Sequence, residues 1–228
     1  MKHDIVAIIP ARGGSKRIRD KNLYPLLKKP ILQHSIEQAK KSKLLKDVFV
    51  SSDNNDILNF AKQNNCKTII RPLNLADDFS SSEDALIHAS EFIENNYFKI
   101  NSIMMLQCTS PIRKSYDIDK AINLFYESKA TSLISVVENK RFIWEQSKNK
   151  LYSLNYDYKN RPRTQNVNKQ YMETGSIYIT EKEYLLKTRN RLGGKIIPFI
   201  MNYITNFELD NIEDIKIIEW AMKEYYSN

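Results

Sequence analysis

The sequence predicts an α/β fold, a Rossmann-like, mostly parallel sheet with helices on both faces. Two observations carry this prediction. Five short apolar runs, the first at residues 5–9 and the last at 131–137, alternate with four segments whose apolar residues recur at helical spacing. The first run contains no polar residue, as expected of a strand that is buried on both faces of a parallel sheet.

The elements can be assigned in order along this first part. Strands are expected at residues 5–9, 47–51, 67–70, 103–106 and 131–137. Asp53 or Asn54 can cap the second helix, and Ser81 with Asp84 resembles a capping box for the third. The apolar stripes of the four helices are Leu32, Ile36 and Ala39; Ile57, Leu58 and Ala61; Leu86, Ala89 and Ile93; and Ile118, Ala121, Ile122 and Phe125.

The alternation then ends. Residues 142–171 are rich in aromatic side chains, contain a turn at 147–150 and have no helical period. We interpret roughly residues 140–172 as an inserted hairpin and a small protruding arm, with a long surface loop as the alternative. Because so many aromatic side chains need a cover, we expect the arm to serve dimerisation. Strands at 176–180 and 195–200 follow, and Ile212, Ile215, Ile218 and Met222 form the stripe of a closing helix.

Length and composition fit one globular domain over residues 1–228. The chain is 42% hydrophobic and 27% charged, which excludes a disordered or fibrous protein. No stretch approaches the roughly 18 apolar residues of a membrane span, and the N-terminal apolar run is too short for a signal peptide. Cys66 and Cys108 lie far apart without paired spacing, so we expect a cytoplasmic protein with no membrane contact.

The formal net charge of +8 leaves two interpretations open. A basic protein can bind nucleic acid, acidic lipid or a small anionic substrate, whereas many lysines can also reflect genome base composition. Here the lysines are scattered rather than interleaved with aromatic residues along one face. A nucleic-acid-binding module is therefore only a remote alternative, and we expect no nucleic acid as a partner.

The loop after the first strand carries the clearest chemical signal. In an open α/β sheet ligands bind beyond the carboxyl ends of the strands, and glycines there let backbone N–H groups approach an anion. This loop lacks the spacing of a Walker loop and of the dinucleotide fingerprint. It combines Gly13 and Gly14 with five cations, Arg12, Lys16, Arg17, Arg19 and Lys21, which suits a polyphosphate better than a solvated turn.

Residues 10–17, followed by Lys21 and Asn22, resemble the N-terminal signature of the cytidylyltransferases that make CMP-sialic acid and related CMP-nonulosonic acids. Further blocks match in the same order, at residues 51–53, 71–72, 80–82, 106–113, 161–165 and 171–179. The resemblance covers essentially the whole chain, and it implies a single nucleotidyltransferase domain of the GT-A-like kind. It also implies a reaction in which the anomeric hydroxyl of the sugar attacks the α-phosphate of CTP and pyrophosphate leaves.

The resemblance further implies which residues bind the nucleotide and the metal. Arg12, Ser15, Lys16, Lys21 and Asn22 would hold triphosphate and ribose beside the Gly13-Gly14 backbone; Arg71 with Ser80 and Ser82 would form the cytosine pocket, unless Arg71 makes a helix-terminus ion pair. Mg²⁺ would be held by Asp210 and Glu208, which project to one side of an extended segment. Relatives usually have Asp at the Glu208 position, and Asp214 fits the first turn of the last helix. Arg12, Lys16, Lys21 and Asp210 are the expected catalytic residues.

The sugar would be bound, by the same resemblance, by Gln107, Thr109, Ser110, Arg163, Gln165 and Tyr178. In relatives some of these contacts come from the partner subunit of a dimer, so Arg163 can act within its own subunit or across a homodimer. N-acetylneuraminic, legionaminic and pseudaminic acids all fit as the acidic nine-carbon sugar, and residues 138–144 slightly favour the legionaminic type. A nucleotidylyltransferase that uses Kdo or a sugar 1-phosphate is the alternative.

Overall fold

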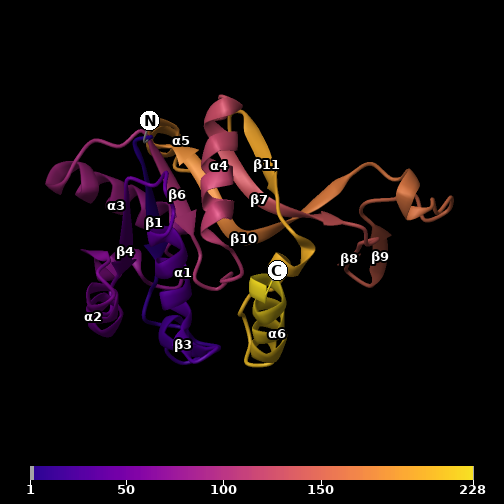
Figure 1. Cartoon of the computed structure of the whole chain (residues 1–228). Coiled ribbons are helices and arrows are strands. Elements are labelled where there is room, and N and C mark those ends of the chain that lie inside the picture. The colour runs from indigo at the N-terminus through magenta and orange to yellow at the C-terminus, as the bar shows by residue number, and fades with distance from the viewer. Residues whose placement is uncertain (1–2, 228) are drawn as a thin grey trace.

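The computed structural model describes residues 3–227. Its centre is a seven-stranded sheet in the order β11-β7-β10-β6-β1-β4-β5 (Figure 1). Every pairing is parallel except those of β10, which runs antiparallel to both of its neighbours. The strands are β1 (Ile5–Pro10), β4 (Asp47–Ser52), β5 (Lys67–Ile70), β6 (Ser102–Leu106), β7 (Ser132–Asn139), β10 (Gln170–Glu181) and β11 (Ile196–Ile200). The predicted mostly parallel sheet is confirmed.

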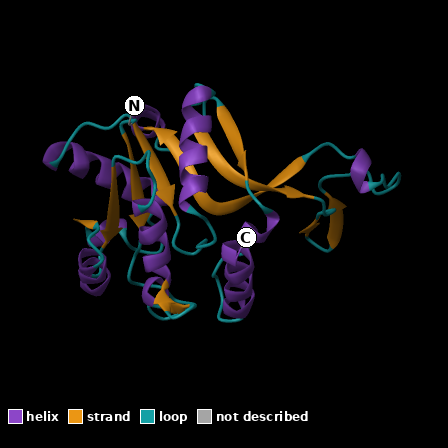
Figure 2. Cartoon of the chain, viewed as in Figure 1, coloured by secondary structure: helices purple, strands orange, loops and turns teal. Residues whose placement is uncertain are grey.

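Helices cover both faces of this sheet, as predicted (Figure 2). Successive residues of β1 point to opposite faces, so Ile5 and Ile9 join one hydrophobic core and Val6 and Ile8 join the other. The first core contains residues of α1 (Ile31–Lys40), α2 (Asn55–Gln63), α4 (Ser115–Glu127) and α6 (Asp214–Ser227). The second contains residues of α3 (Ser82–Asn96) and α5 (Lys182–Thr188).

Side-chain caps fix where the helices near the site begin. The Asn54 side chain accepts hydrogen bonds from the backbone N–H groups of Asp56 and Ile57, at 2.8 and 3.1 Å, so Asn54 rather than Asp53 caps α2. Ser81 accepts from the N–H of Asp84 at 3.0 Å and caps α3, as its sequence spacing predicts. Both caps fix loops that follow strands, where an α/β protein binds its ligands.

Four features differ from the sequence prediction. Strand β10 begins at Gln170 rather than at residue 176, because residues 170–173 pair with the end of β7 where that strand leaves the core. The short helix α5 and the small hairpin of β2 (Pro25–Leu26) and β3 (Lys29–Pro30) were not predicted, since each is too short for a periodic pattern. Helix α6 begins at Asp214, which leaves Ile212 before the helix and exposed.

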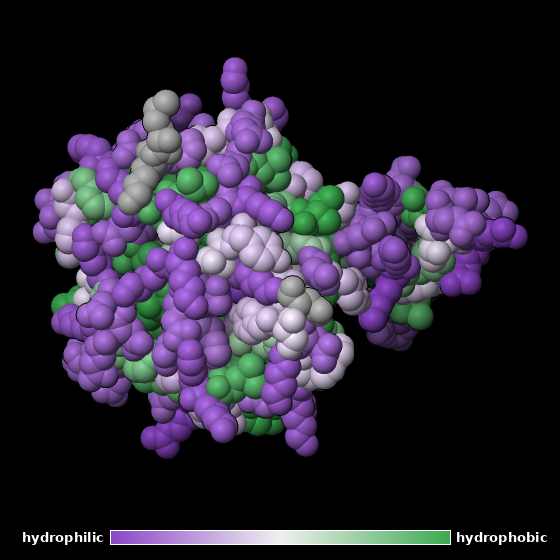
Figure 3. Space-filling model, in the orientation of Figure 1, coloured by the Kyte–Doolittle hydropathy of each residue, from purple (hydrophilic) through white to green (hydrophobic). Residues whose placement is uncertain are grey.

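The arm, residues 140–172, projects away from the sheet (Figures 1 and 3). It contains the predicted hairpin, formed by β8 (Trp144–Ser147) and β9 (Lys150–Ser153), and the 3₁₀ turn η3 (Thr164–Asn166). The rings of Phe142 and Tyr156 pack 4.1 Å apart at its base. Apolar side chains elsewhere on the arm remain exposed, among them Trp144, Leu151, Leu154 and Tyr158. This arm therefore presents uncovered apolar surface.

Two further observations concern membrane-spanning helices and the cysteines. Among residues 3–227, no helix has both the length and the apolar character needed to cross a membrane. Cys66 and Cys108 are free thiols, and both are buried.

Candidate functional site

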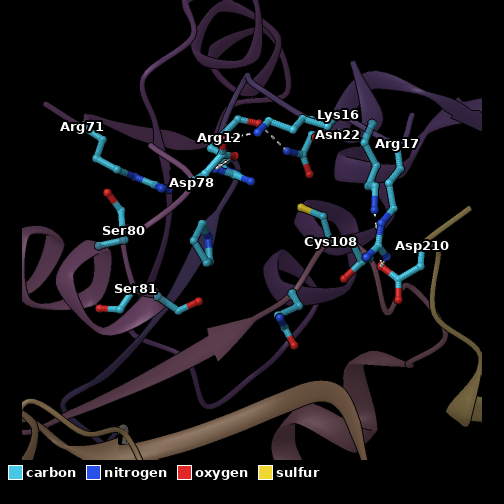
Figure 4. Close-up of a pocket in the computed structure, with 17 residues that line it drawn as sticks. Arg12, Lys16, Arg17, Asn22, Arg71, Asp78, Ser80, Ser81, Cys108 and Asp210 are labelled. Carbon is cyan, nitrogen blue, oxygen red and sulfur yellow. Dashed lines mark hydrogen bonds and ion pairs between the residues drawn. The ribbon is translucent and has the colours of Figure 1, made fainter. Parts of the chain in front are cut away.

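A cavity of about 490 Å³ opens beyond the carboxyl ends of β1, β5 and β6 (Figure 4). This is the edge of the sheet at which the sequence placed the anion-binding loop. Eleven of the predicted site residues line the cavity: Arg12, Ser15, Lys16, Lys21, Asn22, Arg71, Ser80, Ser82, Gln107, Thr109 and Asp210. Pro10, Arg17, Asp78, Ser81, Ala85 and Cys108 complete the lining.

The cavity has two chemically different ends. Figure 4 shows Arg71, Ser80 and Ser81 at one end and Arg17 and Asp210 at the other. The Arg12, Lys16 and Asp78 side chains lie between them. The cavity thus runs from a polar, hydroxyl-rich end, past a group of cations, to a carboxylate.

The middle of the cavity is held by the loop that follows β1. The Arg12 guanidinium donates to the backbone oxygen of Asp77 at 2.8 Å and pairs with the Asp78 carboxylate at 3.2 Å. Lys16 pairs with the same carboxylate. The Asn22 amide donates to the Arg12 backbone oxygen at 2.9 Å, which fixes the start of the loop.

Gly13 is required at its position. A Cβ there would lie 2.9 Å from Cβ of Asn54, the residue that caps α2. The Gly13 N–H donates to Asp53 Oδ1 at 3.0 Å, so Asp53 anchors this loop instead of capping the helix. Gly14 has open space around it.

Asp78 is a lining residue that the sequence reasoning missed. Neighbouring Asp77 forms a local turn in which its Oδ1 accepts from the Ser80 N–H and from the Ser80 hydroxyl, each at 2.7 Å. The Asp-x-x-Ser spacing of residues 77–80 was the available signal for this turn. The turn presents the Asp78 carboxylate to Arg12 and Lys16, so two of the expected phosphate ligands share one carboxylate in the free chain.

Arg71 lies at the hydroxyl-rich end and is almost fully buried. Its Nη2 donates to the Ser51 backbone oxygen at 2.6 Å and its Nε to the Ser51 hydroxyl at 3.2 Å. Burial lowers the pKa of the guanidinium, and the nearby Asp53 charge opposes that shift. In the described part of the chain Arg71 forms no ion pair, so the alternative of a helix-terminus ion pair is not observed.

The carboxylate end is formed by the segment before α6. Asp210 pairs with Lys21 at 3.5 Å and with Arg17 at 3.8 Å, while the Lys21 ammonium donates to the Leu209 backbone oxygen at 2.9 Å. Asp214 lies in the first turn of α6, as predicted, and its Oδ2 accepts from the N–H groups of Asp210 and Asn211. These contacts hold Asp210 beside the cationic loop.

Glu208 lies behind the lining, two residues from Asp210. Its Oε1 accepts from the Ser110 hydroxyl at 3.0 Å. Burial raises the pKa of the Glu208 carboxyl, and the nearby charges of Asp210 and Glu173 raise it further. Ser110 is buried and joins this carboxylate to the turn after β6.

Gly175 explains how these groups approach one another. It has φ +63° in β10, at the register shift between Glu173 and Tyr178. A Cβ at Gly175 would collide with Glu208 Oε1, Ser110 Oγ and Gln107 Oε1. The glycine thus leaves room for three oxygen atoms, two from the turn after β6 and one from the segment before α6.

The donor chemistry of the two predicted metal ligands fits a hard divalent cation. Both are carboxylates, and the side chain of Asp210 is 53% exposed beside the cavity. Burial is the main cause of the raised pKa of Glu208, and the charges of Asp210 and Glu173 add to it; a cation between these carboxylates would balance that charge. Across residues 3–227 no group of three His, Cys, Asp or Glu side chains gathers as a metal-binding cluster, so remaining ligands would come from substrate and water.

Tyr178 lies outside the cavity lining. It is buried in the second core, where its hydroxyl donates to Glu173 Oε2 at 2.9 Å and the Arg191 guanidinium lies 4.6 Å from its ring centroid. Burial raises the pKa of the phenol to about 12, and the Glu173 carboxylate adds to the shift. Tyr178 therefore belongs to the second core and does not face the cavity of its own chain.

Arg163 and Gln165 lie on the arm, away from the residues that line the main cavity. Arg163 precedes the turn η3 and is exposed, and Gln165 lies within that turn. Gln165 lines a second cavity, of about 310 Å³, at the base of the arm. The two cavities share no lining residue. One chain thus keeps these two residues apart from the other candidate site residues.

His34 and Cys108 have the environments of structural residues. His34 Nε2 lies 2.8 Å from the Leu26 backbone oxygen inside the first core region. Cys108 is buried, and burial raises the pKa of its thiol to about 12, which does not suit a nucleophile at neutral pH.

The chain matches the Cytidylyltransferase family model over residues 6–219. The chain is 31% identical to the N-acylneuraminate cytidylyltransferase of Escherichia coli O18:K1:H7 (strain RS218 / NMEC), covering 95% of this chain and 52% of that protein. It is also 31% identical to the Campylobacter coli post-translational flagellin modification protein B, with 97% and 96% covered. A pseudaminic acid cytidylyltransferase of Campylobacter jejuni subsp. jejuni serotype O:23/36 (strain 81-176) is 31% identical, with 96% of each chain covered.

Solved structures show the same fold. A CMP:2-keto-3-deoxy-manno-octonic acid synthetase in complex with CTP superposes with a TM-score of 0.71 at 16% identity, covering 96% of this chain and 98% of that one. A 4-diphosphocytidyl-2C-methyl-D-erythritol synthase from Anaerococcus prevotii DSM 20548 gives 0.65 at 16% identity, with 100% and 97% covered. The chain therefore spans about half of the E. coli protein but nearly all of the Campylobacter proteins and of both solved structures.

Proposed function

Because the chain belongs to the cytidylyltransferase family, we propose that it transfers CMP from CTP to the anomeric hydroxyl of a nonulosonic acid. The observation that carries this proposal is the cavity, whose hydroxyl-rich end, central cations and carboxylate end match the base, the triphosphate and the metal of CTP in order. Relatives named for N-acylneuraminate and pseudaminic acid support the class of acceptor.

In the proposed reaction the sugar's anomeric oxygen forms a bond to the α-phosphorus of CTP. The bond between that phosphorus and the bridging oxygen of the β-phosphate breaks, and pyrophosphate leaves with the electron pair. The hydroxyl proton passes to solvent. Because no protein side chain forms a covalent bond to the substrates in this step, the reaction rate depends on positioning and on neutralising negative charge.

The hydroxyl-rich end of the cavity would bind the base through Arg71, whose guanidinium is fixed by two hydrogen bonds to Ser51. Ser80 and Ser82 would complete the base pocket. The Gly13-Gly14 backbone, Ser15 and Asn22 would hold the ribose and phosphates. Arg12, Lys16 and Lys21 would stabilise the departing pyrophosphate, once the triphosphate replaces Asp78 as the partner of Arg12 and Lys16.

Asp210 and Glu208 would hold Mg²⁺, which when bound neutralises phosphate charge and polarises the α-phosphoryl group. Lys21 would orient Asp210, since its ammonium already pairs with that carboxylate and donates to the Leu209 backbone oxygen. The reducing environment that suits two free, buried thiols supports a cytoplasmic site for this reaction.

The acceptor would lie against Gln107, Thr109 and Ser110. Tyr178 stays a predicted contact near the mouth of the site, although it lies outside the cavity lining of its own chain. Arg163 and Gln165 would bind its carboxylate and polar side arm from the partner subunit of a homodimer. Their position on the arm, away from the cavity of their own chain, supports this arrangement. The exposed apolar side chains of the arm support a subunit contact there.

The test is pyrophosphate release by the purified chain with Mg²⁺. CTP is compared with UTP, GTP and ATP, and neuraminic, legionaminic and pseudaminic acids are compared with Kdo and sugar 1-phosphates. We expect release only with CTP and one nine-carbon acid. Release with a sugar 1-phosphate or with GTP would contradict the assignments of Arg71, Arg163 and Gln165.

Kdo is the second candidate acceptor, because a structural neighbour is a synthetase of the CMP derivative of that eight-carbon acid. The same assay separates the two candidates. Turnover with Kdo that exceeds turnover with every nine-carbon acid would replace the nonulosonate proposal while leaving the nucleotide assignments intact.

A mixing experiment tests whether Arg163 acts across the dimer. Arg163→Ala leaves the cavity intact, and Asp210→Asn leaves the arm intact, so each variant alone is expected to be nearly inactive. Co-expressed, they would restore one complete site in each mixed dimer, giving about a quarter of wild-type activity after random pairing. The control pairs Asp210→Asn with Arg12→Ala, which both damage the cavity and should give no recovery. A mixture no more active than its parents would place Arg163 in its own subunit's site.

A further inference from the structure

Arg113 has an unusual environment for a charged side chain. It is fully buried, directly behind the turn that lines the cavity after β6. Burial lowers the pKa of its guanidinium to about 10, so the group is still charged at neutral pH. In residues 3–227 it forms no ion pair within 4 Å, and four hydrogen-bond acceptors balance its charge, with a further contribution from the nearby Asp117 carboxylate. Burying such a cation is costly unless its geometry is well satisfied.

The guanidinium fastens both ends of one turn. Its Nη2 donates to the backbone oxygens of Gln107 and Ser110, at 2.6 and 2.7 Å. Between these two oxygens lie Cys108 and Thr109, which line the cavity together with Gln107. One nitrogen atom therefore fixes the shape of the turn that would face the acceptor sugar.

The other nitrogens of Arg113 fasten this turn to two elements of the sheet layers. Nη1 donates to the Ser35 hydroxyl in α1, and Nε donates to the Ser176 hydroxyl in β10, both at 2.9 Å. Ser176 follows Gly175, the residue around which Gln107, Ser110 and Glu208 approach. The planar fork of an arginine can satisfy these four acceptors together, whereas the ammonium of lysine cannot.

The turn at residues 107–110 also supports the segment that carries Glu208 and Asp210. The Thr109 backbone oxygen accepts from the Leu209 N–H at 2.8 Å, and the Ser110 hydroxyl donates to Glu208. Leu209 lies between the two proposed metal ligands. A displacement of the turn would therefore move Glu208 and Asp210 as well as the surface that faces the sugar.

We propose that Arg113 is a positioning residue for CMP transfer: it holds the turn at residues 107–110 and, through that turn, the carboxylates of Glu208 and Asp210. This inference rests on the proposed function. The CTP-binding residues Arg12 and Arg71 are held by other contacts, to Asp77 and Ser51, so loss of the Arg113 geometry leaves nucleotide binding largely intact. Loss of the Arg113 contacts instead lowers kcat and changes the dependence of activity on Mg²⁺.

The test is Arg113→Lys, which keeps the charge and removes the fork. We expect kcat per folded molecule to fall about 10- to 100-fold, because a shift of about 1 Å at reacting groups costs that much. The KM for CTP should change less than about twofold, and half-maximal activity should require more Mg²⁺. Arg189→Lys, at a residue paired with Asp84 outside the cavity, controls for the substitution itself.

A lower Tm with an unchanged kcat and an unchanged Mg²⁺ titration would show that Arg113 only stabilises the fold, and would overturn the proposal. If Arg113→Lys does not fold, Ser176→Ala replaces it, since it removes only the acceptor of Nε. That variant should lower kcat without changing the KM for CTP, and a normal kcat would equally overturn the proposal. Failure of the proposed function is distinguished because the wild-type chain would then release no pyrophosphate from CTP with any nonulosonic acid.

Discussion

Arg12→Ala is expected to lower kcat/KM for CTP by about 1000-fold, the size of effect seen when a cation that stabilises transferring phosphates is removed. Arg12 lies in the middle of the cavity, where its guanidinium already pairs with one carboxylate and one backbone oxygen. Its backbone oxygen is held by Asn22, so the substitution should leave the loop in place. The measurement is steady-state pyrophosphate release, with circular dichroism to verify folding.

Arg19→Ala is the matched control for this prediction. It removes the same side chain from the same loop, but the Arg19 side chain is 97% exposed and, within residues 3–227, pairs only with neighbouring Asp20. We expect its kcat/KM to stay within about twofold of wild type, because an exposed charge contributes little in water. Near-normal turnover of Arg12→Ala would remove Arg12 from the phosphate site.

Asp210→Asn is expected to abolish most of the Mg²⁺-dependent activity, by about 100-fold or more, while the fold is retained. The amide keeps the shape of the side chain but loses the charge that would hold a divalent cation. Its backbone N–H still donates to Asp214, so the segment before α6 should keep its conformation. The measurement is initial rate against Mg²⁺ concentration at saturating CTP.

The control is Glu213→Gln, which removes one negative charge three residues further along from an exposed side chain. We expect its Mg²⁺ titration to match that of the wild type. An Asp210→Asn titration that also overlays the wild-type curve would exclude Asp210 as a metal ligand. A loss of activity that higher Mg²⁺ restores would agree with weakened binding at this carboxylate.

Much of the fold was predictable because its signals are local. The apolar stripes of α1 to α4 and α6 and the apolar runs of the parallel strands appear in the sequence itself. The direction and start of β10 were not predictable, because they depend on its pairing with β6 and β7. Each paired residue of β10 has its partner more than 30 positions earlier in the sequence. Its first residues, on the arm, lack the apolar pattern of a buried strand.

The candidate site likewise has a part that was predictable from the sequence and a part that was not. The cationic loop and Arg71 follow strands directly, so the sheet alone brings them to one edge. The meeting of Glu208, Ser110 and Gln107 depends on the positive φ of Gly175, a conformation that its sequence did not reveal. Arg113 lay inside a recognised block, but its function depends on contacts with α1 and β10 that sequence spacing does not show.

Strand β10 belongs to the arm at one end and to the central sheet at the other. Its hydrogen-bonded ladder stiffens both halves, and the register shift at Gly175 is the place where the strand can bend. Glu208, Ser110 and Gln107 surround this glycine, so a change in the bend at Gly175 would displace the wall that these three residues form. A contact that fixes the direction of the arm would therefore also affect the shape of that wall. In the proposed homodimer, dissociation on dilution would therefore change the shape of the pocket even where no residue of the partner touches the substrate.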